Sequence, residues 1–581
     1  MPKITKVLVA NRGEIAIRIF RGCRELGLGT VAVYSEIDRD ALHVTFADEA
    51  YLLGDTAPSA SYLNIPKILA AAERSGADAV HPGYGFLAEN AGFAQAVIDA
   101  GLTWIGPPPG AIEAAGDKLS ARKIAARAKV PSVPGSPGSI PGPEAIVPFA
   151  QQHGWPVALK AAKGGGGRGF RVVRNENEAR GAFDGATREA ELSFGNSQIY
   201  MERYLEHPRH IEIQILADQH GNVVYLGERD CSLQRRHQKL LEESPSPALD
   251  HQTRRAMGES AASFAREVGY FSAGTVEFLF EEGPDGPQFF FLEMNTRLQV
   301  EHPVTELVCG IDLVHAMIRV AEGAPLGFTQ DEVSLRGHAI ECRINAENPL
   351  RDFLPNPGSI GEYSEPGGPG VRVDSGARAG TVIPPSYDSL ISKLIVYGAD
   401  RQEAIRRMVR ALDEYRIEGL VSTIPFHRLV LASNWFAEGN FSTKTIENDL
   451  DLEEIDLGET GAPGAPSPKP RKVSLELNGK RFEVKFTELS GRLTKPKPPE
   501  QTHKSLSGSG DTLTAPMQGT IVKILRAPGD KVTAGDAILV LEAMKMENQI
   551  VCHMDGVVKE VLVKAGQTVA LGSKLAVVAA E

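Results

Sequence analysis

The chain has few cysteines, and no two of them are close together in the sequence. Five cysteines in 581 residues lie far apart without a CxxC pattern, so neither a zinc site nor a disulfide framework is indicated. Reduced thiols are usual in a cytoplasm, and we expect a cytoplasmic protein. No apolar run is long enough to cross a bilayer, and MPKITKVLVANRGE is too polar for a signal peptide. We therefore expect no membrane partner.

The chain also lacks an excess of positive charge. Its formal net charge is -12, whereas a nucleic-acid surface needs clustered Lys and Arg to release counterions. We therefore expect no nucleic-acid partner, although this total is compatible with a local basic pocket. The length is several times the usual domain size of about 100 to 150 residues, so roughly three to five domains are expected.

The pattern of apolar residues changes along the chain. Residues 6–35 read as a strand from Val7 to Ala10, a helix with Ile15, Ile19 and Cys23 on one face, and a second strand, which is typical of a parallel α/β unit. Strands and helices alternate to about residue 110. Residues up to about 325 then show α+β texture with long alternating strands such as 211–216, 223–226 and 275–280, and a mixed segment ends with an amphipathic helix around 403–415.

Two segments rich in Pro, Gly, Ser and charge, residues 458–472 and 495–510, indicate linkers. Between them, residues 473–486 alternate around Asn478-Gly479, which is a strong hairpin signal.

The last seventy residues contain a repeat with a period of 37. Met517-x-Gly519 matches Met554-x-Gly556, and Gly529 and Gly535 match glycines 37 residues later. Short Val, Ile and Leu strands between Gly turns predict a small β-barrel or sandwich of two related sheets. Lys545, in EAMKMEN, falls between the halves, where the tip of a hairpin would protrude.

A glycine-dense loop, KAAKGGGGRG, begins at Lys160 and follows the predicted strand 156–159. Glycine backbone can approach an anion closely, which suits a triphosphate. The loop is neither a P-loop nor a dinucleotide fingerprint. A plain flexible turn is the alternative, but the two bracketing lysines favour a nucleotide.

Two carboxylates lie in consecutive predicted strands joined by the turn 281–287. An antiparallel hairpin would bring Glu277 and Glu293 together, with Asn295 as a third oxygen donor. Hard oxygen ligands of this kind suit Mg²⁺. Two exposed strand carboxylates are the alternative.

Two further stretches are dense in charge. The run from Asn295 to His302 combines amides, Arg297 and Glu301, and residues 235–239 read RRHQK. Taken alone, the first run is equally well explained by a structural ion pair, and the second by a solvated basic stretch. Together, beside a metal and nucleotide, they suit a small oxyanion that attacks the γ-phosphate.

MNTRLQVEHPVTE, RRHQK, KGGGGRGF, HPGYGFLAEN and ECRINAE together resemble the biotin carboxylase family of ATP-grasp enzymes over about residues 1–450. EAMKMEN within the duplication resembles the biotin carrier domain. The resemblance implies an α/β and α+β multidomain fold followed by an all-β biotinyl barrel. Its domains would be 1–114 (N-terminal α/β), 115–325 (ATP-grasp, lid about 131–204), 326–450 (C-terminal), 451–511 (linker with the hairpin) and 512–581 (carrier).

The resemblance also implies roles for individual residues. ATP would be bound by Lys118, Lys160, Gly165, Gly166, Gly167, Glu202, Arg203, Leu205, His210, His237, Glu277 and Glu293, and Mg²⁺ or Mn²⁺ by Glu277, Glu293 and Asn295. Bicarbonate would be bound by Lys239, Arg297, Gln299, Val300 and Glu301, with Glu301 as base. The catalytic set would be Arg297, Glu301, Lys239 and Arg343, with Arg343 facing biotin on Lys545.

The implied function is ATP-dependent carboxylation of biotin by the α subunit of an acyl-CoA carboxylase of the acetyl- or propionyl-CoA type, as in fatty acid biosynthesis. Its partners would be a biotin protein ligase, bicarbonate, a carboxyltransferase (β) subunit and further copies in a homo-oligomeric core. The alternatives are the equivalent subunit of a pyruvate or other 2-oxo acid carboxylase, and a non-catalytic biotin scaffold.

Overall fold

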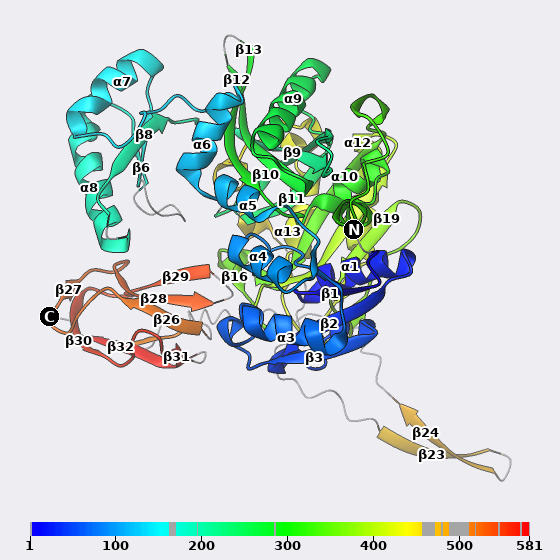
Figure 1. Cartoon of the computed structure of the whole chain (residues 1–581). Helices are drawn as coiled ribbons and strands as arrows, with labels where there is room; N and C mark the ends of the chain where they lie inside the picture. The colour runs from blue at the N-terminus through cyan, green and yellow to red at the C-terminus, as the bar shows by residue number, and fades with distance from the viewer. Residues whose placement is uncertain are drawn as a thin grey trace.

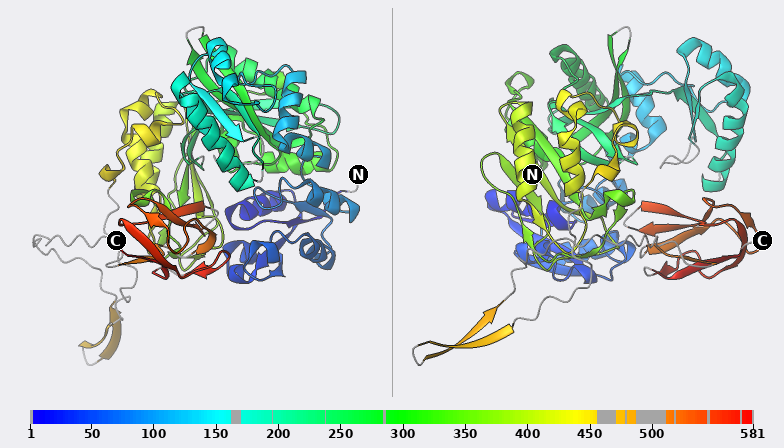
Figure 2. Two further views of the ribbon diagram at one scale, coloured as in Figure 1. Left: turned by 90° about the vertical axis from the view of Figure 1, so that its left-hand side faces the viewer. Right: turned by 180° about the vertical axis from the view of Figure 1, so that it is seen from behind.

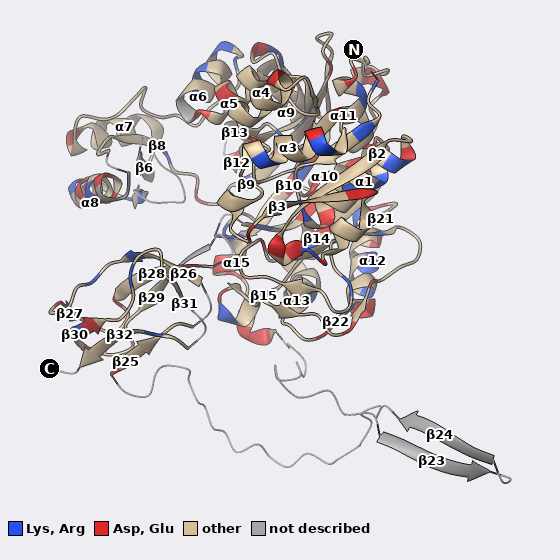
Figure 3. Cartoon of the chain, turned by 60° about the horizontal axis from the view of Figure 1, so that its bottom comes forward, with Lys and Arg blue, Asp and Glu red and all other residues tan. Residues whose placement is uncertain are grey.

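The structure is a computed structural model. It describes residues 3–161, 170–194, 196–236, 238–283, 286–455, 471–477, 480–486, 511–516, 519–543, 546–569 and 572–579. Across these residues, no helix combines the length and the apolar character needed to cross a membrane. The helices drawn in Figure 3 carry Lys and Arg interspersed with Asp and Glu.

The N-terminal part is a parallel sheet with strand order β3-β2-β1-β4-β5. Val7, Leu8 and Val9 are all buried, because a parallel sheet is covered on both faces. The predicted α/β pattern is confirmed. The elements are β1 (Lys6–Val9), α1 (Gly13–Glu25), β2 (Gly29–Ser35), α2 (Leu42–Phe46), β3 (Glu49–Gly54), α3 (Ile65–Ser75), β4 (Ala79–His81), α4 (Ala91–Asp99), β5 (Thr103–Trp104), α5 (Pro109–Gly116) and α6 (Lys118–Arg127).

A three-stranded sheet of order β7-β6-β8 stands out from the body at the upper left of Figure 1. We call it, with its two helices, the lid unit. It has its own small apolar core, which includes Ile146, Leu159 and Ala186. The elements are α7 (Ile146–His153), β6 (Val157–Ala161), β7 (Arg171–Val173), α8 (Glu176–Phe194) and β8 (Ile199–Arg203).

The centre is an eight-stranded antiparallel sheet of order β13-β12-β9-β10-β11-β14-β21-β19. Its first strands and helices are β9 (Arg209–Ala217), β10 (Val223–Arg235), β11 (Gln238–Ser244), α9 (His251–Glu267), β12 (Ser272–Gly283), β13 (Gly286–Asn295), α10 (His302–Cys309), α11 (Leu313–Ala321) and β14 (His338–Asn345). The predicted pairing of the strands that carry Glu277 and Glu293 is confirmed.

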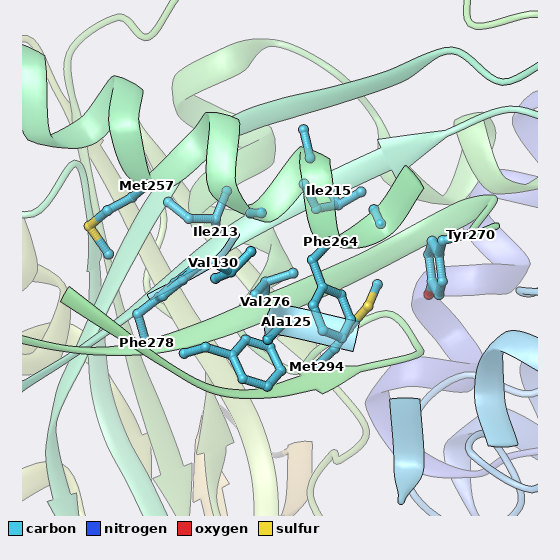
Figure 4. Packing of buried hydrophobic residues seen from close by; sticks show 14 of the residues in the cluster. Ala125, Val130, Ile213, Ile215, Met257, Phe264, Tyr270, Val276, Phe278 and Met294 are labelled. Carbon is cyan, nitrogen blue, oxygen red and sulfur yellow. The ribbon is translucent and has the colours of Figure 1, made fainter. Parts of the chain in front are cut away.

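Alternation along the central strands separates a core face from a polar face. Ile213 and Ile215 of β9 and Val276 of β12 pack in the same apolar cluster as Met257 and Phe264 of α9 (Figure 4). Successive strand residues point to opposite faces, so the intervening Glu212, Gln214 and Glu277 lie on the other face. That polar face carries the candidate site.

The C-terminal part of the body completes the sheet. The predicted amphipathic helix is confirmed as α12, whose first turn is capped by Asp400 and whose apolar face packs on β14. The elements are β15 (Glu347–Asn348), β16 (Leu354–Pro355), β17 (Gly358–Ser359), β18 (Tyr363–Ser364), β19 (Val371–Ser375), β20 (Val382–Ile383), β21 (Leu390–Gly398), α12 (Arg401–Glu414), β22 (Arg416–Ile417), α13 (Ile424–Ala432), α14 (Asn434–Glu438) and α15 (Thr445–Asn448).

Beyond the body, the predicted hairpin is confirmed as β23 (Arg471–Leu477) paired with β24 (Lys480–Phe486). The last part of the chain is a sandwich of two four-stranded sheets, β25-β32-β30-β27 and β29-β28-β26-β31 (Figure 2). Its elements are β25 (Thr512–Thr514), β26 (Gly519–Ile524), β27 (Lys531–Val532), β28 (Ala537–Ala543), β29 (Met546–Val551), β30 (Gly556–Val561), β31 (Thr568–Val569) and β32 (Lys574–Ala579).

The sandwich confirms the predicted duplication. β26, β27 and β28 recur 37 residues later as β30, β31 and β32. The halves are interleaved, because β27 pairs with β30 and β31 pairs with β26. The β28–β29 pairing ends at Ala543 and Met546. Lys545, for which the sequence predicts the tip of a hairpin, lies outside the described residues.

Candidate active site

The hairpin of β12 and β13 sets Glu277 directly opposite Glu293. Glu277 is buried, and its Oε1 accepts hydrogen bonds from Asn295 Nδ2 at 2.8 Å and Gln299 Nε2 at 3.0 Å. His210 of β9 places Nε2 3.0 Å from Glu277 Oε2. Burial acts to lower the pKa of His210, but the Glu277 carboxylate outweighs it and raises that pKa.

Lys239 of β11 is the cation at the centre of this face. Its Nζ lies 2.5 Å from Glu212 Oε2, 2.9 Å from Glu277 Oε1 and 2.8 Å from Glu301 Oε1. Burial acts to lower the pKa of Lys239, yet the three carboxylates hold it well above its ordinary value. The amine is therefore a fixed positive charge where an anion can be held.

The rest of the RRHQK stretch behaves differently. Arg235 and Arg236 both form ion pairs with Asp352, so for them the structural interpretation holds. His237 lies outside the described residues. Arg235 and Arg236 therefore belong to an ion-pair cluster with Asp352, whereas Lys239, a few residues later, belongs to the candidate site.

Glu301 immediately precedes α10 and joins two cations. Its Oε1 faces Lys239, and its Oε2 accepts a 2.8 Å hydrogen bond from Arg343 Nη2. Burial acts to raise the pKa of Glu301, but Lys239 and Arg343 lower it well below the ordinary value. In this arrangement Glu301 is an ionised acceptor. It becomes a stronger base when an incoming anion engages the two cations.

Arg343 of β14 is held from two sides. Besides Glu301, its Nε donates to Glu242 Oε1 at 2.6 Å. Arg297 likewise bridges two parts of the chain, because its Nε donates to Glu89 Oε2 at 2.9 Å and its Nη2 to Asn295 Oδ1 at 2.9 Å. Both guanidiniums are therefore oriented before a ligand arrives.

The candidate anion residues Gln299 and Val300 are fixed by buried cations. Gln299 Oε1 accepts a 2.6 Å hydrogen bond from Arg229 Nη2, and the Val300 carbonyl accepts one of 2.9 Å from Lys393 Nζ. Arg229 is fully buried and also donates to Glu212, Gln214, Thr275 and Thr305.

Of the remaining nucleotide candidates, Lys160, Glu202 and Arg203 belong to strands of the lid unit, and Leu205 follows the last of these strands. Lys160 Nζ of β6 is 2.5 Å from Glu202 Oε2 of β8, and Arg122 of α6 pairs with the same carboxylate. Arg203 pairs with Glu281 of β12, and Leu205 is buried. Lys118 begins α6, but its side chain, together with Gly165, Gly166 and Gly167, lies outside the described part.

The donor set fits a hard divalent cation. Glu277 and Glu293 offer carboxylate oxygens from paired strands, and Asn295 offers an amide oxygen, which here accepts a hydrogen bond from Arg297. Oxygen donors of this kind are those that Mg²⁺ prefers.

Sequence reasoning missed Arg229, Glu212, Glu89 and Glu242, all of which contact predicted site residues. A partial signal existed for Glu212, because it alternates with Ile211 and Ile213 in a strand and therefore points away from the core. Arg229 follows a register shift between Tyr225 and Glu228, which breaks that alternation.

Four family models match the chain in succession. They are described as "Biotin carboxylase, N-terminal domain" over residues 3–112, "Carbamoyl-phosphate synthase L chain, ATP binding domain" over 117–329, "Biotin carboxylase C-terminal domain" over 341–448 and "Biotin-requiring enzyme" over 511–578.

The chain is 48% identical over 600 residues to the biotin-dependent acyl-coenzyme A carboxylase alpha3 subunit of Mycobacterium leprae, covering 99% of this chain and 98% of that protein. It is 54% identical over 443 residues to a pyruvate carboxylase subunit of Methanothermobacter thermautotrophicus, covering 76% of this chain and 89% of that protein.

Among solved structures, the biotin carboxylase domain dimer of the Hydrogenobacter thermophilus 2-oxoglutarate carboxylase, in complex with MgADP, ADP and bicarbonate, is 47% identical with a TM-score of 0.71. The match covers 77% of this chain and 98% of that chain.

Proposed function

This chain belongs to the biotin carboxylase family, with a biotin-requiring domain after the carboxylase part, and from that premise we propose that it carboxylates biotin held on its own Lys545. The observation that carries the proposal is the buried cluster of Lys239, Glu301 and Arg343 beside the Glu277 and Glu293 hairpin. In this proposal the cluster supplies the anion site and the base, and the hairpin beside it supplies the metal site.

In this proposal bicarbonate lies between Lys239 and Arg297, with Gln299 and the Val300 backbone at its edge. Glu301 removes the bicarbonate proton, and the two cations hold the resulting charge. General-base help of this kind typically contributes about 10² to 10⁴ in rate. The oxyanion then attacks the γ-phosphate of ATP, which forms carboxyphosphate and releases ADP.

ATP is bound, in this proposal, by Lys118, Lys160, Gly165, Gly166, Gly167, Glu202, Arg203, Leu205, His210 and His237. Glu277, Glu293 and Asn295 would hold Mg²⁺ or Mn²⁺, and the ion would supply positive charge that offsets the charge of the phosphates.

Biotin on Lys545 would supply a ureido nitrogen as the acceptor of the carboxyl group of carboxyphosphate, and the phosphate that leaves would take up the proton of that nitrogen. Arg343 would stabilise negative charge on the neighbouring ureido oxygen, as an oxyanion donor does. Its fixed orientation between Glu242 and Glu301 means that little reorganisation is needed when that charge appears.

We further propose that the carboxyl group passes to an acyl-CoA through a separate carboxyltransferase subunit. The full-length match to an acyl-coenzyme A carboxylase alpha3 subunit, including the C-terminal sandwich, supports this choice over the pyruvate type, whose match covers 76% of this chain. We also propose that a biotin protein ligase attaches biotin to Lys545, and that copies of this chain form a homo-oligomeric core in the cytoplasm.

The first test follows the label from bicarbonate. Purified biotinylated protein is incubated with labelled bicarbonate, ATP and Mg²⁺, and we expect protein-bound label that Lys545→Arg abolishes. The same variant should keep bicarbonate-dependent ATP hydrolysis with free biotin. Biotinylated wild-type protein that hydrolyses ATP without acquiring label contradicts the proposal, and a complete lack of biotin-stimulated hydrolysis favours a scaffold.

The second test concerns the acceptor. With a purified carboxyltransferase subunit, label should pass to acetyl-CoA or propionyl-CoA. Transfer to pyruvate alone would replace the acyl-CoA proposal with the 2-oxo acid alternative while leaving the biotin carboxylase step intact.

A further inference from the structure

Two carboxylates that the proposed mechanism does not use face each other next to Arg343. Glu242 of β11 and Glu341 of β14 are directly opposite in antiparallel register, and both side chains are fully buried. Side chains of opposed residues lie on the same face of a sheet with Cβ atoms about 4.5 to 5.5 Å apart. Glu341 shares that face with Arg343, two residues further along β14.

Only one of the four carboxylate oxygens of this pair accepts a hydrogen bond from a described residue. Glu242 Oε1 accepts from Arg343 Nε. Glu242 Oε2 and both Glu341 oxygens are buried and have no hydrogen-bond partner among the described residues. Two adjacent ionised carboxylates in such a place are strongly unfavourable. One proton shared between them removes one charge and supplies the missing donor, as in other carboxyl pairs.

The surrounding charges do not neutralise a second negative charge on the pair. Lys393 of β21 is directly opposite Arg343 on this face, and it already binds the Val300 carbonyl at 2.9 Å and Glu14 at 3.2 Å. The charged groups that face the pair are Lys239 (β11), Arg343 (β14), Lys393 (β21), Glu301 (before α10), and, around Lys393, Glu14 (α1) and Asp374 (β19).

The titration of both groups agrees with the geometry. Burial raises the pKa of Glu242 to about 7, against the opposing effect of Arg343. Burial also raises the pKa of Glu341 well above its ordinary value.

We propose that Glu242 and Glu341 share one proton and thereby act as positioning residues for Arg343. While the proton is present, the pair carries one negative charge, and Arg343 divides its donors between Glu242 and Glu301. When the proton leaves for solvent, the second negative charge draws the guanidinium toward the pair and away from the ureido oxygen. The inference rests on the proposed role of Arg343 in biotin carboxylation.

The test compares Glu341→Gln with the wild-type holoenzyme. Glutamine keeps the shape and supplies an N–H donor that does not titrate, so the pair keeps one charge at every pH. We expect the alkaline limb of the biotin-dependent ATPase rate to move up by about one pH unit, which is about tenfold in rate above the limb. An unmoved limb overturns the proposal.

Glu347→Gln is the matched control. Glu347 is also a buried glutamate whose pKa burial raises to about 7, but it accepts hydrogen bonds from Ser389 and Asn345 instead of Arg343. We expect this variant to leave the alkaline limb in place. An equal shift in Glu347→Gln assigns the effect to general burial and also overturns the proposal.

An infrared titration gives a readout that does not depend on activity. The band of protonated carboxyl groups lost on raising the pH through neutrality should be smaller by one group in Glu341→Gln than in the wild type. If Glu341→Gln does not fold, Glu242→Gln is measured in the same way. An unchanged band contradicts the shared proton. Wild-type protein with this band but no biotin-dependent hydrolysis would contradict the proposed function instead.

Discussion

The candidate site on the central sheet and the ion pairs at the lid unit use the same kinds of side chain in different surroundings. Arg229 and Glu212 are fully buried on the central sheet. At the lid unit, the side chains of Lys160 and Arg122 are 32% and 30% exposed around Glu202. Removing one partner of a buried pair leaves an uncompensated charge, whereas a pair near solvent is rehydrated. Proximity of opposite charges therefore does not by itself measure their importance.

The largest expected difference concerns catalysis. We expect Glu301→Gln to lower the biotin-dependent ATPase rate at saturating ATP by about 10² to 10⁴, because the general base is lost. Glu202→Gln at the lid unit should instead raise the KM for ATP and change kcat by less than about tenfold. Steady-state kinetics on both variants check this, and equal losses of kcat would break the comparison.

The second largest difference is expected in the free energy of unfolding when an arginine is removed from each region. Arg229→Met removes one of the two cations that pair with the buried Glu212, together with the donor to Gln299 Oε1, and we expect the free energy of unfolding to fall by about 3 to 5 kcal/mol. Arg122→Met, on α6 beside the lid unit, should cost about 1 kcal/mol or less, because Arg122 is partly exposed and the buried Glu202 keeps its pair with Lys160. Urea unfolding followed by circular dichroism measures both, and a smaller cost for Arg229→Met would refute the distinction.

The pH dependence of stability tests the same difference between buried and exposed ion pairs at Glu306 of α10. Burial acts to raise the pKa of Glu306, but Arg18, with His302 and Arg372, brings it down to about 2 from 4.5. This depressed pKa stabilises the fold fully above pH 4.5, and the stabilisation is lost as the pH falls toward about 2.

We expect Glu306→Gln to lose about 3 kcal/mol at neutral pH and to show a flatter acid limb in thermal unfolding. Glu259→Gln, in the exposed pair of Arg255 and Glu259, serves as the control and should follow the wild-type curve. Parallel curves for wild type and Glu306→Gln would show that the carboxylate does not make this contribution.

The smallest effect is expected at the surface end of RRHQK. Arg236 is 45% exposed in its pair with Asp352, so Arg236→Gln should change stability by about 0.5 kcal/mol or less and leave ATP hydrolysis unchanged. A large loss of activity would mean that this end also belongs to the site.

The sequence predicted what depends on local pattern. Period-two alternation and an obvious turn placed Glu277 opposite Glu293, and the 37-residue repeat predicted the two related sheets. The motif resemblance added Lys239, Glu301 and Arg343, and the structure brings these three together.

Sequence reasoning missed the residues that contact the site residues through long-range packing. Glu89 meets Arg297 across 208 residues of chain, and no local pattern encodes that contact. Glu242 meets Glu341 through the register of strands β11 and β14, which is set by the whole sheet. Such contacts follow from topology, so motifs identify the reactive groups more readily than the groups that orient them.

The interleaving of the two halves of the C-terminal sandwich has a consequence for how that domain arose and unfolds. Because β27 bonds to β30 and β31 bonds to β26, each half supplies a strand that completes the other half's sheet. A single 37-residue unit would leave those edges open, so an ancestral half is expected to have paired with a second copy before fusion. The fused domain should accordingly melt in one step, unlike stacked repeats whose units can unravel one at a time.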